Sequence, residues 1–369
     1  MKTKANAPIE VDAHAGTKPS NASRPLRCGV IGVGRMGRHH ARKYAQLAGV
    51  ELVGVVDMDE ERRSQVAADN NCRHFATEQE LLAAGVDAVT IAVPTVYHLG
   101  CATPLLEAGV ACLIEKPLAT DVAEAEQLTA LAEKTGAVLM VGHIERFNPA
   151  VRALQKAHEG ESDNDASGLV PRFIEVHRVS PMTFRSVDVS VVMDMMIHDL
   201  DVVLWLMGGI EPVDVQASGV AVLTEVEDVC NARLTFDAPQ GKCIANITAS
   251  RLAMKTERKT RIIGENGYVS IDYAKQSGVL IRKTANEVQM QAVREALRQG
   301  QDLSDLDYGD LITIEPLMDV SDADQLEQEV TSFLDVVHSG KTPPIDARAG
   351  LAAVRTAERI MEAARLDWS

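Results

Sequence analysis

Apolar residues in the first part of the chain fall in short continuous runs, and the stretches between them repeat apolar positions at helical spacing. Continuous apolar strands that alternate with helices are typical of a parallel sheet covered on both faces, so the pattern predicts a doubly wound α/β domain. The expected strands are 27–31, 52–57, 88–93, 111–114 and 138–141, and the expected helices are 38–47, 60–68, 99–108 and 121–135.

After Asn148-Pro149 the pattern changes to alternation of apolar and polar residues, which indicates antiparallel strands with one exposed face. Strands are expected at 173–177, 229–236, 242–249, 261–263 and 268–272, hairpin connections at 237–241 and 265–267, and helices at 191–206, 324–339 and 349–364. We therefore predict a second, α+β domain with a large, mostly antiparallel sheet. Residues 1–24 lack periodicity and are expected to form a mobile tail, so the two domains should span 25–146 and 147–369.

The turn after the first strand carries Gly32-Val33-Gly34-Arg35-Met36-Gly37 and opens the first helix. In this context the glycines permit a tight turn, a close backbone approach to a pyrophosphate and close packing of helix on strand. Asp57 ends the second strand, where a carboxylate accepts hydrogen bonds from a ribose diol and repels a 2′-phosphate, and Met58 offers no guanidinium. We predict a Rossmann domain that binds NAD(H) rather than NADP(H). The alternative is a glycine turn of another α/β protein.

Two more loops follow strands of this sheet, and ligands of such sheets bind outside the carboxyl ends of the strands. Pro94 and His98 are expected to border the cofactor, with a plain helix-start role for His98 as the alternative. Glu115-Lys116-Pro117 follows the next strand. Lys116 there could bind a substrate hydroxyl, stabilise an alkoxide or transfer a proton if burial lowers its pKa. The alternative is a solvated charge pair.

Asp194, His198 and Asp201 lie on one stripe of the helix expected at 191–206, which is otherwise apolar nearly all round. Buried carboxylates are costly without partners, so this stripe is expected to face a cleft. A structural Asp–His–Asp hydrogen-bond network is the alternative. A metal site is not expected, because no further cluster of ligand residues is evident.

Several polar residues near these motifs are suited to an anionic ligand, because guanidinium groups bind phosphate in a bidentate way. The candidates for substrate binding are His143, Arg146 and Asn148 after the strand at 138–141, Arg178 and Arg185 before the polar helix, and Asp201. Ordinary ion pairing is the alternative for any single arginine.

Composition narrows the class of protein. The chain has 369 residues, with 37 Lys and Arg against 53 Asp and Glu, so its net charge of −16 argues against nucleic-acid and anionic-membrane partners. No apolar run approaches the roughly 20 residues of a membrane span, and no secretory signal is visible. The 6 cysteines are scattered and resemble core residues of a reduced, cytoplasmic protein.

Together these motifs resemble the Gfo/Idh/MocA oxidoreductase family: the glycine loop with Asp57, the loop of Pro94 and His98, Glu115-Lys116-Pro117, and Asp194-x3-His198-x2-Asp201. The resemblance implies an NAD-dependent dehydrogenase that oxidises a sugar CH–OH group, with Lys116, Asp194 and His198 as catalytic residues. It also implies a second domain with an open-faced sheet that binds substrate and mediates homo-oligomer contacts in a dimer or tetramer.

Within the family, residues 141–149 and 194–201 are most similar to UDP-N-acetylglucosamine 3-dehydrogenases, as is a pattern that includes Arg178 and Arg185. This resemblance implies oxidation of the sugar 3-hydroxyl to a 3-keto sugar nucleotide, from which an aminotransferase makes the 3-amino sugar used in lipid A. A dehydrogenase of a free polyol or sugar and a non-catalytic dinucleotide-binding regulator are the alternatives. Either Lys116 or His198 could be the formal base.

Overall fold

The computed structural model describes residues 24–159, 169–184, 187–303, 309, 311–317 and 324–364. The first sheet has the order β3-β2-β1-β4-β5-β6, and all of its neighbours pair in parallel. Its strands are β1 (Leu26–Ile31), β2 (Val50–Val56), β3 (Arg73–Phe75), β4 (Ala88–Ile91), β5 (Ala111–Glu115) and β6 (Leu139–Gly142). The order reverses between β1 and β4, and the resulting crevice is where such sheets bind ligands.

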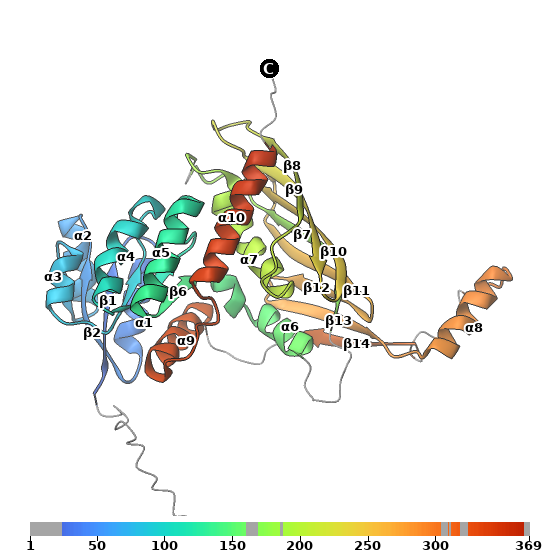
Figure 1. Ribbon diagram of the computed structural model, residues 1–369, viewed down its shortest axis with the longest axis horizontal. Coiled ribbons are helices and arrows are strands. Elements are labelled where there is room, and N and C mark those ends of the chain that lie inside the picture. Colours follow the sequence, from blue (N-terminus) through green and yellow to red (C-terminus); the bar gives the residue numbers. More distant parts are fainter. Residues whose placement is uncertain are drawn as a thin grey trace, which may run out of the picture.

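Helices cover both faces of this sheet, as the continuous apolar strands require (Figure 1). Strand residues such as Leu113 and Ile114 on β5 are fully buried. The covering helices are α1 (Gly37–Gln46), α2 (Glu60–Asp69), α3 (Glu78–Ala83), α4 (His98–Glu107) and α5 (Val122–Thr135). The predicted doubly wound domain is therefore confirmed.

The second sheet has the order β14-β13-β12-β11-β7-β10-β9-β8 and is antiparallel except where β7 pairs with β10. Its strands are β7 (Pro171–Val179), β8 (Asp214–Val220), β9 (Val229–Ala238), β10 (Gly241–Ser250), β11 (Glu257–Gly264), β12 (Gly267–Asp272), β13 (Ser277–Lys283) and β14 (Ile312–Leu317). Figure 1 shows α6 (Pro149–Glu159), α7 (Ile197–Leu206) and α10 (Ala347–Ala364) on one side of it. The mostly antiparallel, open-faced sheet that we predicted is confirmed.

The C-terminal helices return to the first sheet and join the two units. Helix α9 (Gln325–Ser339) packs on α1, where the Lys43 ammonium lies 2.9 Å from both Asp324 and Glu327. Helix α10 packs on α5, α7 and β8, and the Val141 amide donates to the Ile345 carbonyl at 2.9 Å. The path of the chain therefore crosses between the predicted domains more than once.

One local expectation needs correction, and one lies almost wholly outside the described residues. The helix expected at 191–206 contains a π-helical turn, η3 (Val192–Met196), before α7 continues as an α-helix, and the spacing of apolar residues does not distinguish the two kinds of turn. Residues 1–23 of the expected mobile tail lie outside the described residues, and Arg24 is held by two hydrogen bonds of 2.8 Å to Asp87. Within the described ranges, every helix is too short or too polar to cross a bilayer.

Candidate active site

The carboxyl ends of β1, β2, β4 and β5 border a cavity of about 900 Å³. It lies at the reversal of strand order, where the sequence places the cofactor. Its lining includes most of the residues expected to bind the dinucleotide, namely Gly32, Gly34, Arg35, Met36, Asp57, Pro94 and Glu115, together with Lys116.

The glycine loop fits the role of a pyrophosphate cradle. Gly32 has a φ of +82°, and a Cβ there would lie 2.8 Å from the Ala92 carbonyl oxygen. A Cβ on Gly37 would lie 1.8 Å from the Gly32 carbonyl oxygen, so α1 can approach β1 only with glycine at this position. In contrast, a Cβ on Gly34 would meet no protein atom within 4 Å. Gly34 therefore leaves space open at the N-terminus of α1, where the helix favours phosphate.

Asp57 is anchored at the ribose end of this cavity. Its carboxylate accepts from the Val33 amide at 2.9 Å and from the Asp59 amide at 3.0 Å. Arg62 lies 3.1 Å from Asp57 and 3.0 Å from Asp59. The sequence reasoning considered only Met58 as a source of a guanidinium and missed Arg62, which the first turn of α2, capped by Asp59, brings back to Asp57. Asp59, as a helix-capping residue just before Arg62, was the signal in the sequence that could have revealed this contact.

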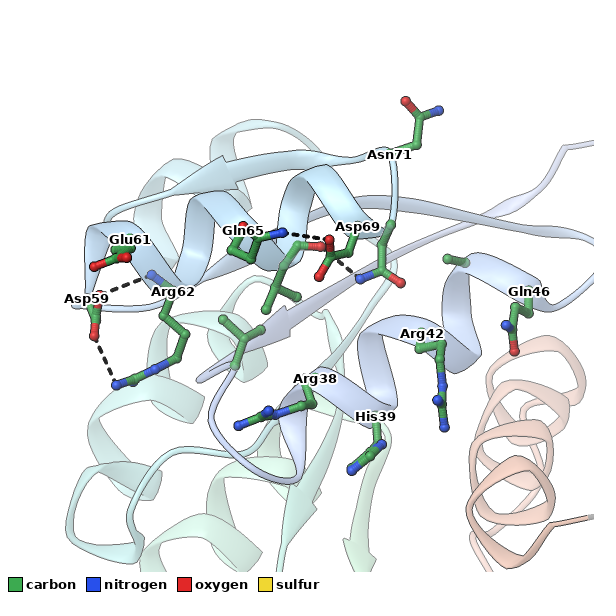
Figure 2. A pocket seen from close by; sticks show the side chains of 14 residues that line it. Arg38, His39, Arg42, Gln46, Asp59, Glu61, Arg62, Gln65, Asp69 and Asn71 are labelled. Carbon is green, nitrogen blue, oxygen red and sulfur yellow. Dashed lines mark hydrogen bonds and ion pairs between the residues drawn. The ribbon is translucent and has the colours of Figure 1, made fainter.

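Arg62 also borders a second hollow of about 850 Å³, which is lined by residues of both α1 and α2. Figure 2 shows the helix α1 with Arg38, His39 and Arg42, and beside it α2 with Glu61, Gln65 and Asp69; residues of both helices line this hollow. Because Arg62 is paired with two carboxylates, its charge is already compensated at the ribose end.

Lys116 joins the cofactor cavity to the second domain. Its Nζ donates to the Asp194 carbonyl at 2.6 Å and lies 3.6 Å from the Asp194 carboxylate. Burial lowers the pKa of Lys116, although the charges of Asp194 and Glu115 oppose this shift. The structure thus brings together Lys116, which directly follows β5, and Asp194 from η3, two residues that the resemblance grouped in one site.

Two histidines lie in the same electrostatic environment. His198 is partly buried, and its pKa is well below the usual value because of burial and the positive charges of Lys116 and Arg178. His143 is 1% exposed, and burial lowers its pKa. Among the described residues, Nδ1 of His198 and both ring nitrogens of His143 have no hydrogen-bond partner. Buried polar atoms of this kind are expected to bind a ligand or water.

Arg178 has a different environment from the one that the sequence suggested. It is 3% exposed, and its guanidinium bonds Asp199 at 2.6 and 3.0 Å and Glu145 at 3.1 Å. These carboxylates raise the pKa of Arg178 above its usual value against the effect of burial. This placement argues against the expected contact with a diphosphate. Arg185, the other candidate, lies outside the described residues.

Three other candidates are engaged within the protein. Arg146 forms a bidentate pair with Asp201 at 2.6 and 2.9 Å, and Asp201 is 1% exposed. The Asn148 amide donates to the Tyr273 carbonyl at 3.3 Å, and its oxygen accepts from the Ala150 amide at 3.1 Å. The polar residues of the helix at 191–206 therefore have different environments: Asp194 lies against Lys116, while Asp201 is bound to Arg146.

His98 is fully buried behind the cavity wall. Its Nε2 lies 3.0 Å from the Val93 carbonyl, and its Nδ1 lies 3.1 Å from the Pro117 carbonyl. It ties the loop after β4 to the loop after β5, which favours the structural alternative for this residue over contact with the cofactor.

Comparison with known proteins agrees with this geometry. A model described as "Oxidoreductase family, NAD-binding Rossmann fold" matches residues 26–143, and one described as "GFO/IDH/MocA C-terminal domain" matches residues 178–270. A UDP-N-acetylglucosamine 3-dehydrogenase from Acidithiobacillus ferrooxidans is 36% identical over 336 residues, which cover 91% of this chain and 96% of that protein. The chain belongs to the Gfo/Idh/MocA oxidoreductase family.

Other members of the Gfo/Idh/MocA family extend the comparison. The solved structure of the Acidithiobacillus ferrooxidans enzyme superposes with a TM-score of 0.77 at 36% identity and covers 92% of this chain and 97% of that one. An inositol 2-dehydrogenase from Rhizobium meliloti is 27% identical over 67% of this chain and 76% of that protein. The WlbA dehydrogenase from Bordetella pertussis, solved with NADH and UDP-GlcNAcA, shares the fold at 22% identity, with a TM-score of 0.73 over 93% of this chain and 96% of that one. The chain described here is therefore an NAD-dependent sugar dehydrogenase of this family.

Proposed function

We propose that this enzyme oxidises the 3-hydroxyl of UDP-N-acetylglucosamine to the 3-keto sugar nucleotide, a precursor of the 3-amino sugar of lipid A. The observation that carries the proposal is the contact between Lys116 and Asp194, because it joins the cofactor cavity to the second domain. The 36% identity to a UDP-N-acetylglucosamine 3-dehydrogenase over 91% of the chain supports the choice of sugar.

The residues around Lys116 suit removal of a hydroxyl proton. Burial lowers the pKa of Lys116, so more of the amine is neutral and able to accept a proton at a given pH. After transfer, the ammonium is stabilised by the Asp194 carbonyl and carboxylate, which lie 2.6 and 3.6 Å from Nζ. When bound, NAD⁺ supplies the acceptor for the hydride that leaves the sugar carbon.

His198 is the second candidate for the base. Its lowered pKa keeps the ring neutral near pH 7, so it can accept a hydrogen bond or a proton. The positive charge of Lys116 opposes protonation of His198, and the two groups are therefore not expected to be cationic together. We propose that Lys116 and His198 share the proton, with Asp194 holding Lys116 in place.

A free polyol or sugar is the second candidate substrate. The buried pairing of Arg178 with Asp199 and Glu145 removes one expected contact for a diphosphate. The inositol 2-dehydrogenase at 27% identity is consistent with this alternative. The non-catalytic regulator is disfavoured, because a sensor would not need Lys116 beside Asp194 at the mouth of the cofactor cavity.

NADH formation at saturating NAD⁺ tests the substrate. UDP-N-acetylglucosamine should give the highest kcat/KM, and N-acetylglucosamine and myo-inositol should give little. An aminotransferase that consumes the 3-keto product should be coupled to the assay so that product does not accumulate. Turnover of myo-inositol with none of the sugar nucleotide would contradict the proposal, and Lys116→Met supplies the background rate.

We also propose that the enzyme is a cytoplasmic homo-oligomer, a dimer or tetramer that assembles through the exposed face of the second sheet. Register pairs align an apolar row across five strands, with Ile263 and Ile314 exposed by 41% and 66%. The row consists of Phe173, Ile263, Tyr268, Ile281 and Ile314. Light scattering of Ile263→Asp tests this, and an unchanged mass would contradict it.

A further inference from the structure

Glu329 on α9 is fully buried, yet neither of its carboxylate oxygens has a hydrogen-bond partner among the described residues. Burial and the nearby charge of Glu115 raise the pKa of Glu329 well above its usual value. A lone buried carboxylate would be costly, so this group is expected to hold its proton. It then carries an O–H donor that needs an acceptor.

The acceptor is available on the neighbouring His40–Glu115 pair. One ring nitrogen of His40, one oxygen of Glu115 and one oxygen of Glu329 lie within 4.8 Å of one another. His40 Nε2 lies 2.9 Å from Glu115 Oε1, and a carboxylate only accepts, so Nε2 carries the proton of this bond. In the neutral ring, Nδ1 is then an acceptor, and it is buried without a partner among the described residues. The Glu329 donor therefore lies beside the His40–Glu115 pair, and the His40 ring of that pair carries an unused acceptor.

This cluster lies directly behind the cofactor cavity. Glu115 lines the cavity and precedes Lys116, while its other oxygen would lie 3.3 Å from a Cβ on Gly142 of β6. Burial opposes it, but the bond from His40 and the charge of Lys116 hold the pKa of Glu115 below its usual value. The bond from His40 thus orients Glu115, and Glu329 is the buried group that lies beside both residues.

We propose that Glu329 is a positioning residue. Its protonated carboxyl group donates a hydrogen bond to His40, and His40 in turn holds Glu115 in the cofactor cavity. A single bridging water, or a small rotation of the Glu329 side chain, is enough to connect Glu329 with His40 across the distance of at most 4.8 Å within the cluster. Helix α9 carries Glu329 to α1 from the far end of the chain, and the Lys43 ion pairs fix that helix beside His40. The inference concerns the NAD site and does not depend on which sugar is the substrate.

Three variants of the full-length protein test this. Glu329→Gln keeps a donor without a charge and should bind NADH within about twofold of the original protein. Glu329→Leu removes the donor and should weaken NADH binding about tenfold, with a smaller change in kcat. Thr356→Val is the matched control, since Thr356 is also fully buried with an unpartnered hydroxyl among the described residues, and it should leave NADH affinity unchanged. NADH fluorescence gives the dissociation constants.

Infrared spectroscopy gives a readout that simple packing would not move. The original protein should have a carbonyl band of a protonated carboxylic acid that is missing in Glu329→Gln. NADH affinity unchanged in Glu329→Leu would overturn the proposal in favour of a packing role. Equal losses in Glu329→Gln and Glu329→Leu, or one equivalent of a divalent metal in the purified protein, would overturn it in favour of an ionised carboxylate or a cation site.

Discussion

The Lys116 ammonium and the Asp194 backbone carbonyl are 2.6 Å apart, although Lys116 directly follows β5 and Asp194 lies in the π-helical turn η3. This hydrogen bond connects the parallel sheet to the second domain at the mouth of the cofactor cavity. A π-helical turn leaves backbone groups less regularly bonded than an α-helix does, and such turns are frequent at functional sites. The bond therefore gives the lysine a fixed orientation before substrate binds.

Replacing Lys116 with methionine should remove proton transfer and leave the cavity shape nearly intact. We expect kcat to fall by about 10²–10⁴-fold, the range for loss of a positioned acid–base group. NADH affinity should change by less than about threefold, because binding of the dinucleotide depends mainly on the glycine loop and Asp57. Steady-state kinetics and NADH fluorescence measure the two quantities. A kcat within tenfold of the original would assign the base to another residue, with His198→Ala as the comparison.

Asp194→Asn should shift the pH dependence of kcat/KM. If neutral Lys116 accepts the proton, activity rises with pH as Lys116 loses its own proton. The Asp194 charge raises the pKa of Lys116, so its removal lowers that pKa further and moves the rise to lower pH, by about one unit. A pH series on both proteins measures this shift. A shift to higher pH, or none, would contradict the assignment.

Two glycines of the dinucleotide loop should fail in different ways when each is changed to alanine. Gly37→Ala places a Cβ 1.8 Å from the Gly32 carbonyl oxygen and should destabilise the fold by about 1–3 kcal/mol. Gly34→Ala meets no protein atom within 4 Å and should leave the melting temperature unchanged while weakening NADH binding. Thermal unfolding and NADH fluorescence separate the two effects. Equal losses of stability would show that the loop differs from this description.

Asp57 and Arg62 should set the choice between NAD and NADP together. Asp57→Ala removes the ribose acceptor and frees the guanidinium that lies 3.1 Å away, so kcat/KM for NAD⁺ should fall about tenfold and that for NADP⁺ should rise. The double variant with Arg62→Ala should lose the gain with NADP⁺. If Asp57→Ala alone shows no gain, Arg62 does not reach a 2′-phosphate.

Some candidate site residues lie where the sequence placed them, and others have partners that the sequence did not indicate. Lys116 and Gly32 follow apolar strands, and parallel strands end at one edge of a sheet, so their place was predictable from local pattern. Arg178 and Asp201 were expected to meet substrate because they are polar and near the motifs. Their partners Asp199 and Arg146 come from other elements, and no periodicity in the sequence indicates which charges will be buried together.

The sequence by itself determined the doubly wound first domain, the NAD loop and the place of Lys116 at the sheet edge, because strand burial and glycine geometry are local properties with a short repeat. Only the tertiary structure decided that Arg178 is enclosed by Asp199 and Glu145, and that Glu329 lies near His40. These contacts join residues from separate helices and strands: Arg178 lies 21 and 33 positions from its partners Asp199 and Glu145, and His40 and Glu329 come from the packed helices α1 and α9. They depend on how elements pack, and packing depends on the whole core rather than on any one segment.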